Sequence, residues 1–246
     1  MPSGGGMQAN RNRRLPRDSG IRSWLNRLAV LVMLALAVGA VAGPAAGAPP
    51  GVPDGYAYTH ALTYRIFRGD DPIGTSTVEV YARGADRAIV TRTSIDVAVF
   101  FYSYTSRHAA TEVWENGRLV ALKTRTNDDG EAFEVSSTYG PEGLRVSGAA
   151  GAYTVPAGVP AKSFWNRDIL TASHVITTKR GALEPVQTTT LGRETVEFIG
   201  GTVKATRSRF KTDDVIDLWY TDDGLLVKAL RDSIGGDILY LLDTTG

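Results

Sequence analysis

The chain has 246 residues, no cysteine and a formal net charge of +1. The absence of cysteine excludes disulfide bonds, Cys-ligated zinc, thiol catalysis and iron–sulfur clusters. Residues 1–42 hold six of the 27 Lys and Arg residues but one of the 26 Asp and Glu residues, which leaves 21 basic and 25 acidic residues in the remainder. This mildly acidic remainder lacks the clustered positive charge that nucleic acid requires, so we expect no nucleic-acid partner.

Residues 1–42 have the composition of a secretory signal peptide. Six arginines between Arg11 and Arg27 precede an uncharged apolar run over 28–42, which ends on small residues at Ala42. An uncleaved membrane anchor would need roughly 20 mainly apolar residues, and proline and glycine interrupt the sequence soon after Ala42. We therefore predict cleavage after Ala42 and export to the periplasm or the cell exterior, with a soluble protein after release.

Beyond the leader, the sequence predicts a tether and one β domain. Residues 43–55 are rich in Gly, Ala and Pro and carry no periodicity, which is typical of a flexible linker. Residues 56–246 show β-branched and aromatic runs separated by glycine-containing turns, and only Lys162–Leu170, with Ser163 as a candidate cap, looks helical. We predict an all-β single domain with a strongly curved antiparallel sheet, a half-barrel or barrel, and one short helical insertion.

Two turns predict the pairing of three consecutive strands. If Asn116-Gly117 is a two-residue turn, Glu115 pairs with Arg118, and regular pairing continues down both strands. If Asp129-Gly130 is the next tight turn, Arg125 opposes Glu134. Side chains alternate between the two faces of a strand, so this register predicts one charged face, which holds His108, Glu112, Trp114, Lys123, Arg125 and Glu134.

The charged face is the best candidate binding site in the sequence. One interpretation is a solvated outer surface whose cross-strand ion pairs contribute about 0.2–1 kcal/mol each. The other is the polar lining of a concave ligand site. Trp165 lies in an irregular insertion, where it would either plug one end of a barrel or gate a cavity. The candidate ligand-binding residues are Tyr104, His108, Glu112, Trp114, Arg125, Glu134 and Trp165.

Signatures of catalysis and metal binding are absent from the sequence. The three histidines, His60, His108 and His174, have no metal-ligand spacing, and the acidic pairs lack the spacing of a calcium loop. Ser208-Arg209-Phe210-Lys211 matches Ser-x-x-Lys, but it lies in a strand pattern without the companion motifs of penicillin-recognising enzymes. We therefore predict no metal, no cofactor and no catalytic residue.

Three segments resemble an uncharacterised family of exported bacterial β-proteins, which is known only as a domain of unknown function. They are Arg107–Leu119, Thr126–Gly130 and Leu218–Gly224, and Tyr64–Phe67 and Ile73–Thr75 support them. More distantly, the long meander with one short insertion is similar to the half-barrels of the lipoprotein-localisation (Lol) carriers. These resemblances imply a strongly curved antiparallel sheet around an apolar cavity, and they imply no activity.

The leading functional hypothesis is a non-enzymatic envelope protein that binds a lipid or another apolar or amphipathic small molecule inside the sheet. The first alternative is a hydrolase or isomerase that uses His108 with a nearby carboxylate, although His108 and Glu112 would lie about 13 Å apart along one strand. The second alternative is an assembly scaffold with an envelope protein partner, which would pair with exposed edge strands at Tyr56–Phe67 or Ile238–Leu242.

Overall fold

Alternating apolar and polar residues that end at glycine turns form β-structure along almost the whole described chain. The computed structural model describes residues 51–99, 102–233 and 236–245. The predicted signal peptide and residues 43–50 of the predicted tether lie outside these residues. The prediction of an all-β protein is confirmed.

The elements follow one another along the chain with short connections up to β8 and again from β11. They are β1 (Ala57–Arg68), β2 (Asp71–Arg83), β3 (Asp86–Val99), β4 (Tyr102–Glu115), β5 (Arg118–Asp128), β6 (Glu131–Gly140), β7 (Gly143–Gly148), β8 (Gly151–Val155), the 3-10 helix η1 (Arg167–Thr171), β9 (His174–Ile176), β10 (Leu183–Pro185), β11 (Gln187–Phe198), β12 (Gly201–Lys211), β13 (Val215–Tyr220), β14 (Leu226–Arg231) and β15 (Ile238–Thr245).

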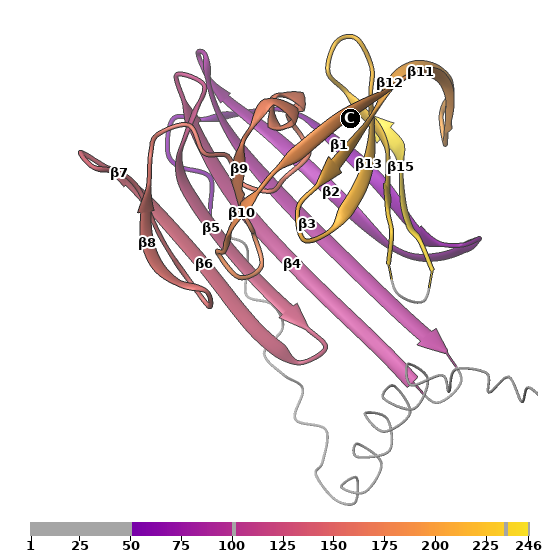
Figure 1. Cartoon of the computed structure of the whole chain (residues 1–246), viewed down its shortest axis with the longest axis horizontal. Coiled ribbons are helices and arrows are strands. Elements are labelled where there is room, and N and C mark those ends of the chain that lie inside the picture. The colour runs from indigo at the N-terminus through magenta and orange to yellow at the C-terminus, as the bar shows by residue number, and fades with distance from the viewer. Residues whose placement is uncertain (1–50, 100–101, 234–235, 246) are drawn as a thin grey trace, which may run out of the picture. The chain divides into compact units, whose positions relative to one another are not determined.

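Thirteen of the described strands form one antiparallel sheet in the order β11-β12-β13-β14-β15-β1-β2-β3-β4-β5-β6-β7-β8. The long strands from β2 to β6 make a curved wall (Figure 1). The two ends of the sheet, β8 and β11, do not pair with each other among the described residues, so the sheet is an open half-barrel. The predicted strongly curved antiparallel sheet is confirmed.

The unpaired edges of the sheet differ from those that the sequence suggested. Tyr56–Phe67 and Ile238–Leu242 were expected to be exposed edges, but β1 pairs with β2 and β15, and β15 pairs with β1 and β14. They lie in the middle of the strand order because β1, the first strand of the chain, pairs with β15, the last strand. Within the described chain, the edges that remain are β8 and β11.

An inserted segment, residues 156–186, lies on one face of the sheet, which we call the inner face. It contains η1 and the separate two-stranded pair β9–β10, and it lies in front of the long strands in Figure 1. Its contacts to the sheet include a hydrogen bond from Thr124 Oγ1 to the carbonyl of Thr178 (2.7 Å) and one from Tyr153 Oη to the carbonyl of Gly181 (2.7 Å). A Cβ on Gly148 would lie 2.6 Å from the carbonyl oxygen of Arg180, so this close approach requires glycine.

The helical part of the insertion is shorter and later than predicted. Helix was expected over Lys162–Leu170 with Ser163 as its cap, but η1 spans Arg167–Thr171 and Asn166 is its N-cap. The Asn166 side chain accepts a hydrogen bond from the backbone N–H of Asp168. The residues before Asn166 form bends, and Ala161 makes a parallel bridge to Ile176 of β9 within the insertion.

One of the two predicted hairpin registers is correct and the other changes partway along the strand. The Asp129-Gly130 turn pairs Arg125 with Glu134, as predicted. The Asn116-Gly117 turn pairs Glu115 with Arg118, but a bulge between Val113 and Trp114 shifts the register from that point on. A shift of one residue exchanges the faces of the paired side chains. The predicted single charged face is therefore wrong: Glu112 lies opposite Leu122 on the inner face, whereas Lys123 and Arg125 lie on the outer face.

Two clusters of buried side chains form the core. The larger joins β1–β3 and β11–β15 to the insertion, and the smaller joins β5–β8 to Ala161 and Ile176 of the insertion. Trp114 packs against both clusters, so it lies where the two cores meet. No helix in the described part of the chain is long and apolar enough to cross a membrane.

Candidate ligand-binding cleft

Glu112 is a carboxyl group in the middle of the core. It lies on β4 between Ile89 of β3 and Leu122 of β5, both of which are fully buried. Glu112 itself is 1% exposed. A carboxyl group in such a place is costly unless it is neutral or hydrogen-bonded, so its surroundings decide what it can do.

Two tryptophans donate to the same oxygen of Glu112. Trp114 Nε1 lies 2.9 Å and Trp165 Nε1 lies 3.3 Å from Oε2. The two rings meet edge to face, with centroids 5.5 Å apart and planes at 80°. The other oxygen, Oε1, is buried and has no hydrogen-bond partner among the described residues. Glu112 thus connects the sheet to the insertion and sets the angle between the two rings.

The pKa of Glu112 is raised above its ordinary value of 4.5. The main cause is burial, which disfavours the charged form, and the side chains of Ser163, Trp114 and Trp165 act in the opposite direction. Among the described residues no cation forms an ion pair with Glu112, so only hydrogen bonds oppose the effect of burial on its pKa.

A cleft of about 330 Å³ lies beside this group, between the β4–β5 turn and the insertion. Trp114 and Trp165 are both partly exposed there. The polar side chains of the cleft come from the insertion, and no lysine or arginine lines it. The residues that matter for its chemistry are Trp114, Ser163, Trp165, Asn166, Asp168 and Thr171.

The insertion is held over the inner face by polar and aromatic contacts close to the cleft. Lys162 Nζ lies 2.9 Å from Glu184 Oε2, 2.7 Å from Thr212 Oγ1 and 3.3 Å from Asp214 Oδ2. Tyr220 Oη donates to the carbonyl of Phe164 at 2.8 Å. These bonds hold the stretch that carries Ser163 and Trp165 at Lys162 and at Phe164.

Replacing Lys162 by methionine should lower the free energy of unfolding by about 2 kcal/mol, because Glu184 and Asp214 lose their common cation in a site that is largely shielded from water. Chemical denaturation followed by tryptophan fluorescence measures this change. Arg125→Met removes a cation from an exposed pair on the outer face, where side chains are 48% and 73% exposed, and should have a much smaller effect. Equal losses in both variants would refute the anchoring role of Lys162.

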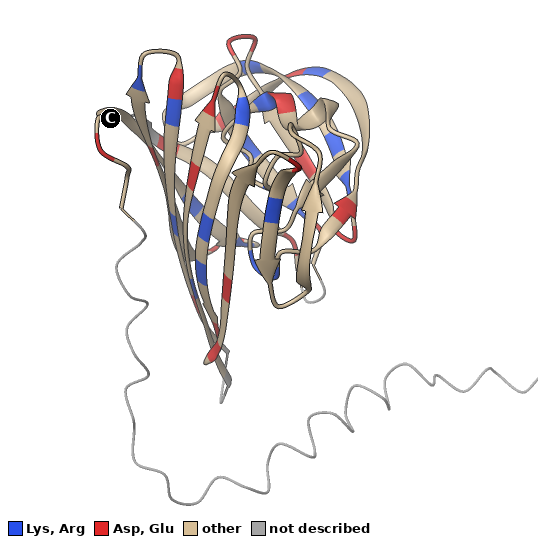
Figure 2. Cartoon of the chain, turned by 90° about the vertical axis from the view of Figure 1, so that its left-hand side faces the viewer, with Lys and Arg blue, Asp and Glu red and all other residues tan. Residues whose placement is uncertain are grey.

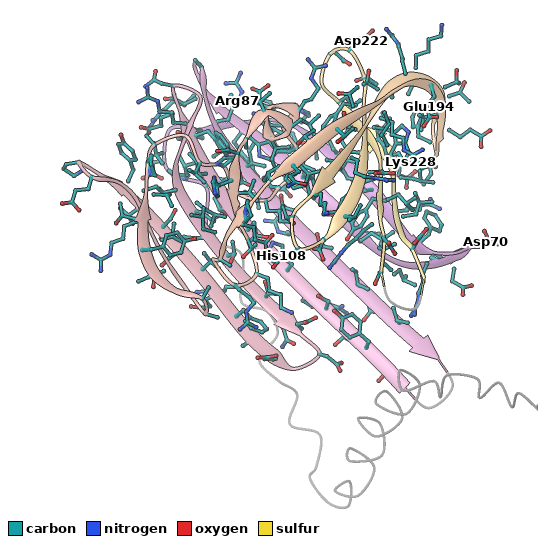
Figure 3. All side chains as sticks on the ribbon, in the orientation of Figure 1. Asp70, Arg87, His108, Glu194, Asp222 and Lys228 are labelled. Atoms are coloured by element: carbon teal, nitrogen blue, oxygen red, sulfur yellow. The ribbon has the colours of Figure 1, made fainter. Side chains whose placement is uncertain are left out.

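His108 lies on the inner face of β4 but does not belong to the cleft. Its Nδ1 is 2.8 Å from Thr126 Oγ1 on β5, and Figure 3 places it away from η1 along the long strands. Burial lowers the pKa of His108 to about 4. The structure thus pairs this histidine with a hydroxyl group, and the sequence hypothesis of a histidine–carboxylate pair finds no such contact among the described residues.

The remaining predicted site residues lie elsewhere. Tyr104 Oη donates to Asp128, which also pairs with Lys179 of the insertion, and burial followed by this bond raises the pKa of Tyr104 to about 12. Arg125 and Glu134 form a 3.2 Å pair on the outer face. Acidic and basic residues are interspersed along the strands in the view of Figure 2. The prediction that Arg125 and Glu134 share a site with Glu112 is therefore wrong, because the bulge in β5 turns Arg125 to the face opposite Glu112.

Of the predicted residues, the structure brings together Glu112, Trp114 and Trp165. Sequence reasoning missed Ser163, Asn166 and Asp168, although the interruption of the β pattern at 163–166 pointed to the same segment. Among the described residues there is no group of three His, Asp or Glu side chains that could hold a metal ion.

A family model described as Domain of unknown function (DUF6134) matches residues 64–243. The crystal structure of a beta-barrel-like protein of domain of unknown function DUF1849 from Brucella abortus has a TM-score of 0.56 and 8% sequence identity, and the match covers 77% of this chain and 97% of that chain. At this identity the likeness concerns the fold alone. No curated protein matches the chain. The predicted resemblance to an uncharacterised family of β-proteins is confirmed, whereas export and the likeness to the Lol carriers stay predictions.

Proposed function

The chain belongs to the family described as Domain of unknown function (DUF6134), and from its own geometry we propose that it is an exported, non-enzymatic envelope protein that binds a small amphipathic ligand. The binding site in this proposal is the cleft between the β4–β5 turn and the insertion. Export rests on the arginine-rich leader and the apolar run that follows it.

The observation that carries the proposal is the arrangement of Glu112 between two partly exposed tryptophans. Both indole N–H groups are bound to Glu112 Oε2, and both rings, which also pack on the core, line the cleft. A buried carboxyl group with one unpartnered oxygen costs stability, about 1–3 kcal/mol for a lost hydrogen bond. Its benefit is positional, because it holds two large aromatic surfaces in place beside an opening.

The volume and surroundings of the cleft favour a small amphipathic ligand over a large lipid. Small-molecule sites typically enclose about 300–1,000 Å³, and this cleft, at about 330 Å³, lies at the lower end. Ile169, Val175 and Ile176 of the insertion are buried on the inner face, which leaves less apolar space than an empty half-barrel would offer. The likeness to Lol carriers therefore extends, in this proposal, to the shape of the sheet and to binding on its inner face.

Native mass spectrometry of the protein purified from its own host tests the proposal, together with tryptophan fluorescence during titration with octyl-chain amphiphiles. We expect a bound small molecule, or a fluorescence change that saturates, in the natural chain and in the outer-face variant Arg125→Ala. In Trp165→Ala, which removes one wall of the cleft, the signal should be lost. Absence of any adduct and of any saturable response in the natural chain would refute the proposal.

A further inference from the structure

The cleft combines two perpendicular aromatic walls with a polar rim. Trp114 and Trp165 stand at 80° to each other, and their N–H groups are already bound to Glu112. What the rings present to the cleft is therefore carbon surface. Such surface binds C–H groups of a ligand well, and aromatic contacts of this kind contribute strongly to small-molecule recognition.

The rim holds the carboxylate of Asp168 and the amide of Asn166. The carboxylate of Asp168 makes no hydrogen bond or ion pair among the described residues. Asn166 uses its amide oxygen to accept from the Asp168 backbone, which leaves its amide nitrogen as a donor. A carboxylate accepts two hydroxyl donors side by side, and an amide nitrogen donates to a hydroxyl oxygen. Together they match a ligand with neighbouring hydroxyl groups.

The charge of the cleft excludes an anionic head group. No basic side chain lines it, and the guanidinium of Arg167 points elsewhere, toward the carbonyls of Thr221 and Asp222. A phosphate or carboxylate would meet Asp168 and no cation. A quaternary ammonium group would suit Asp168 and the indole rings, but it could not accept a hydrogen bond from the amide nitrogen of Asn166.

We propose that the ligand of this cleft is a saccharide ring, either free or as the neutral head group of a glycolipid-like amphiphile. This inference rests on the proposed function and names the chemical class of its ligand. The C–H face of the sugar packs into the corner between Trp114 and Trp165, while its hydroxyl groups bind Asp168 and Asn166. The volume of about 330 Å³ suits one or two rings.

Amphiphiles with the same octyl tail and different head groups test the proposal on the full chain. The probes are octyl glycosides of glucose, galactose and N-acetylglucosamine, octanoate and octyltrimethylammonium, each titrated below micelle formation and followed by tryptophan fluorescence. At least one glycoside should bind about tenfold more tightly than octanoate and octyltrimethylammonium, and the matching methyl glycoside should compete with it. Asp168→Ala should weaken glycoside binding about tenfold, the loss expected for a hydrogen bond to a charged group, and should not weaken octanoate binding. Arg125→Ala is the matched control and should change nothing.

The outcomes separate this inference from the proposed function. Octanoate or octyltrimethylammonium binding as tightly as every glycoside would overturn the saccharide assignment and leave the binding function standing. Glycoside binding that is unchanged in Asp168→Ala would overturn the assignment to this cleft. If no probe produces a saturable response and no adduct is present in protein from the host, both proposals fail.

Discussion

Replacing Glu112 by alanine should lower the free energy of unfolding by about 3 kcal/mol. The variant loses two hydrogen bonds from indole groups and leaves a void between Ile89 and Leu122, which are both fully buried. Urea unfolding followed by circular dichroism measures the loss. The exposed carboxylate Glu134 on the outer face provides the matched control, and Glu134→Ala should stay within about 0.5 kcal/mol of the natural chain.

The isosteric variant Glu112→Gln separates hydrogen bonding from charge. Because the folded pKa of Glu112 is raised above 4.5, the folded chain binds more protons than the unfolded chain between these two values. The stability of the natural chain should therefore fall as pH rises from 4.5 through the folded pKa. Glu112→Gln cannot ionise, so its stability relative to the natural chain should increase over this window. Parallel stability curves for the two proteins would contradict a raised pKa of Glu112 in the folded chain.

Replacing Asp217 by alanine should also destabilise the fold, by about 2 kcal/mol, and with the opposite dependence on pH. Asp217 lies on the outer face of β13, its side chain is 5% exposed, and it binds both Arg207 and Arg209. The arginines are about a third to a half exposed, so water compensates part of the loss. Arg207 also packs over Trp219, and removing Asp217 would free it from that position.

The pKa of Asp217 is lowered, first by its hydrogen bond to Arg209 and also by Arg207. The unfolded chain then binds more protons than the folded chain below the ordinary value of 3.8, and the stabilisation present above that value is lost as pH falls through the folded pKa. Denaturation of the natural chain and of Asp217→Asn at several pH values measures this difference. An advantage of the natural chain that persists unchanged into strong acid would contradict the ion-pair role.

The contrast between Glu112 and Asp217 follows from their surroundings. Both carboxyl groups are almost fully buried, but one is surrounded by indole rings on the inner face and the other by two guanidinium groups on the outer face. Figure 3 labels Glu194 and Lys228, which contact Trp219. Glu194 accepts a hydrogen bond from Trp219 Nε1, and the ammonium group of Lys228 lies over the Trp219 ring. The two arginines lower the pKa of Asp217, whereas burial beside aromatic rings raises the pKa of Glu112.

The turn residues predicted where the hairpins turn, but the register of the strands that follow depends on the tertiary structure. Asn116 and Asp129 adopt positive φ values of 51° and 53°, as tight hairpin turns demand, and this preference depends on the turn residues alone. The bulge leaves Val120 of β5 unpaired opposite Val113 and Trp114, and Trp114 packs against both buried clusters. Nothing in the sequence of the strand marks the bulge. The predicted pairing is therefore correct for Glu115 and Trp114 and is wrong by one residue from Val113 onward.

The candidate site, like the strand register, was predicted only in part. Aromatic and carboxyl residues in unusual places pointed to Glu112, Trp114 and Trp165, and the structure joins them. Arg125 and Glu134 were grouped with them through the uninterrupted alternation of a regular strand, which the bulge breaks. Asn166 and Asp168 were missed because a loop has no periodicity from which the direction of a side chain can be read.

The sequence alone determined the all-β class, the positions of the hairpin turns and the absence of cysteine chemistry, because these depend on composition and on neighbouring residues. It also predicts an exported chain through its leader. Tertiary structure alone decided that β1 pairs with β15, that the half-barrel stays open between β8 and β11, and that Glu112 faces the insertion. These features arise from contacts between residues far apart in the chain, and a single bulge is enough to exchange the two faces of a strand.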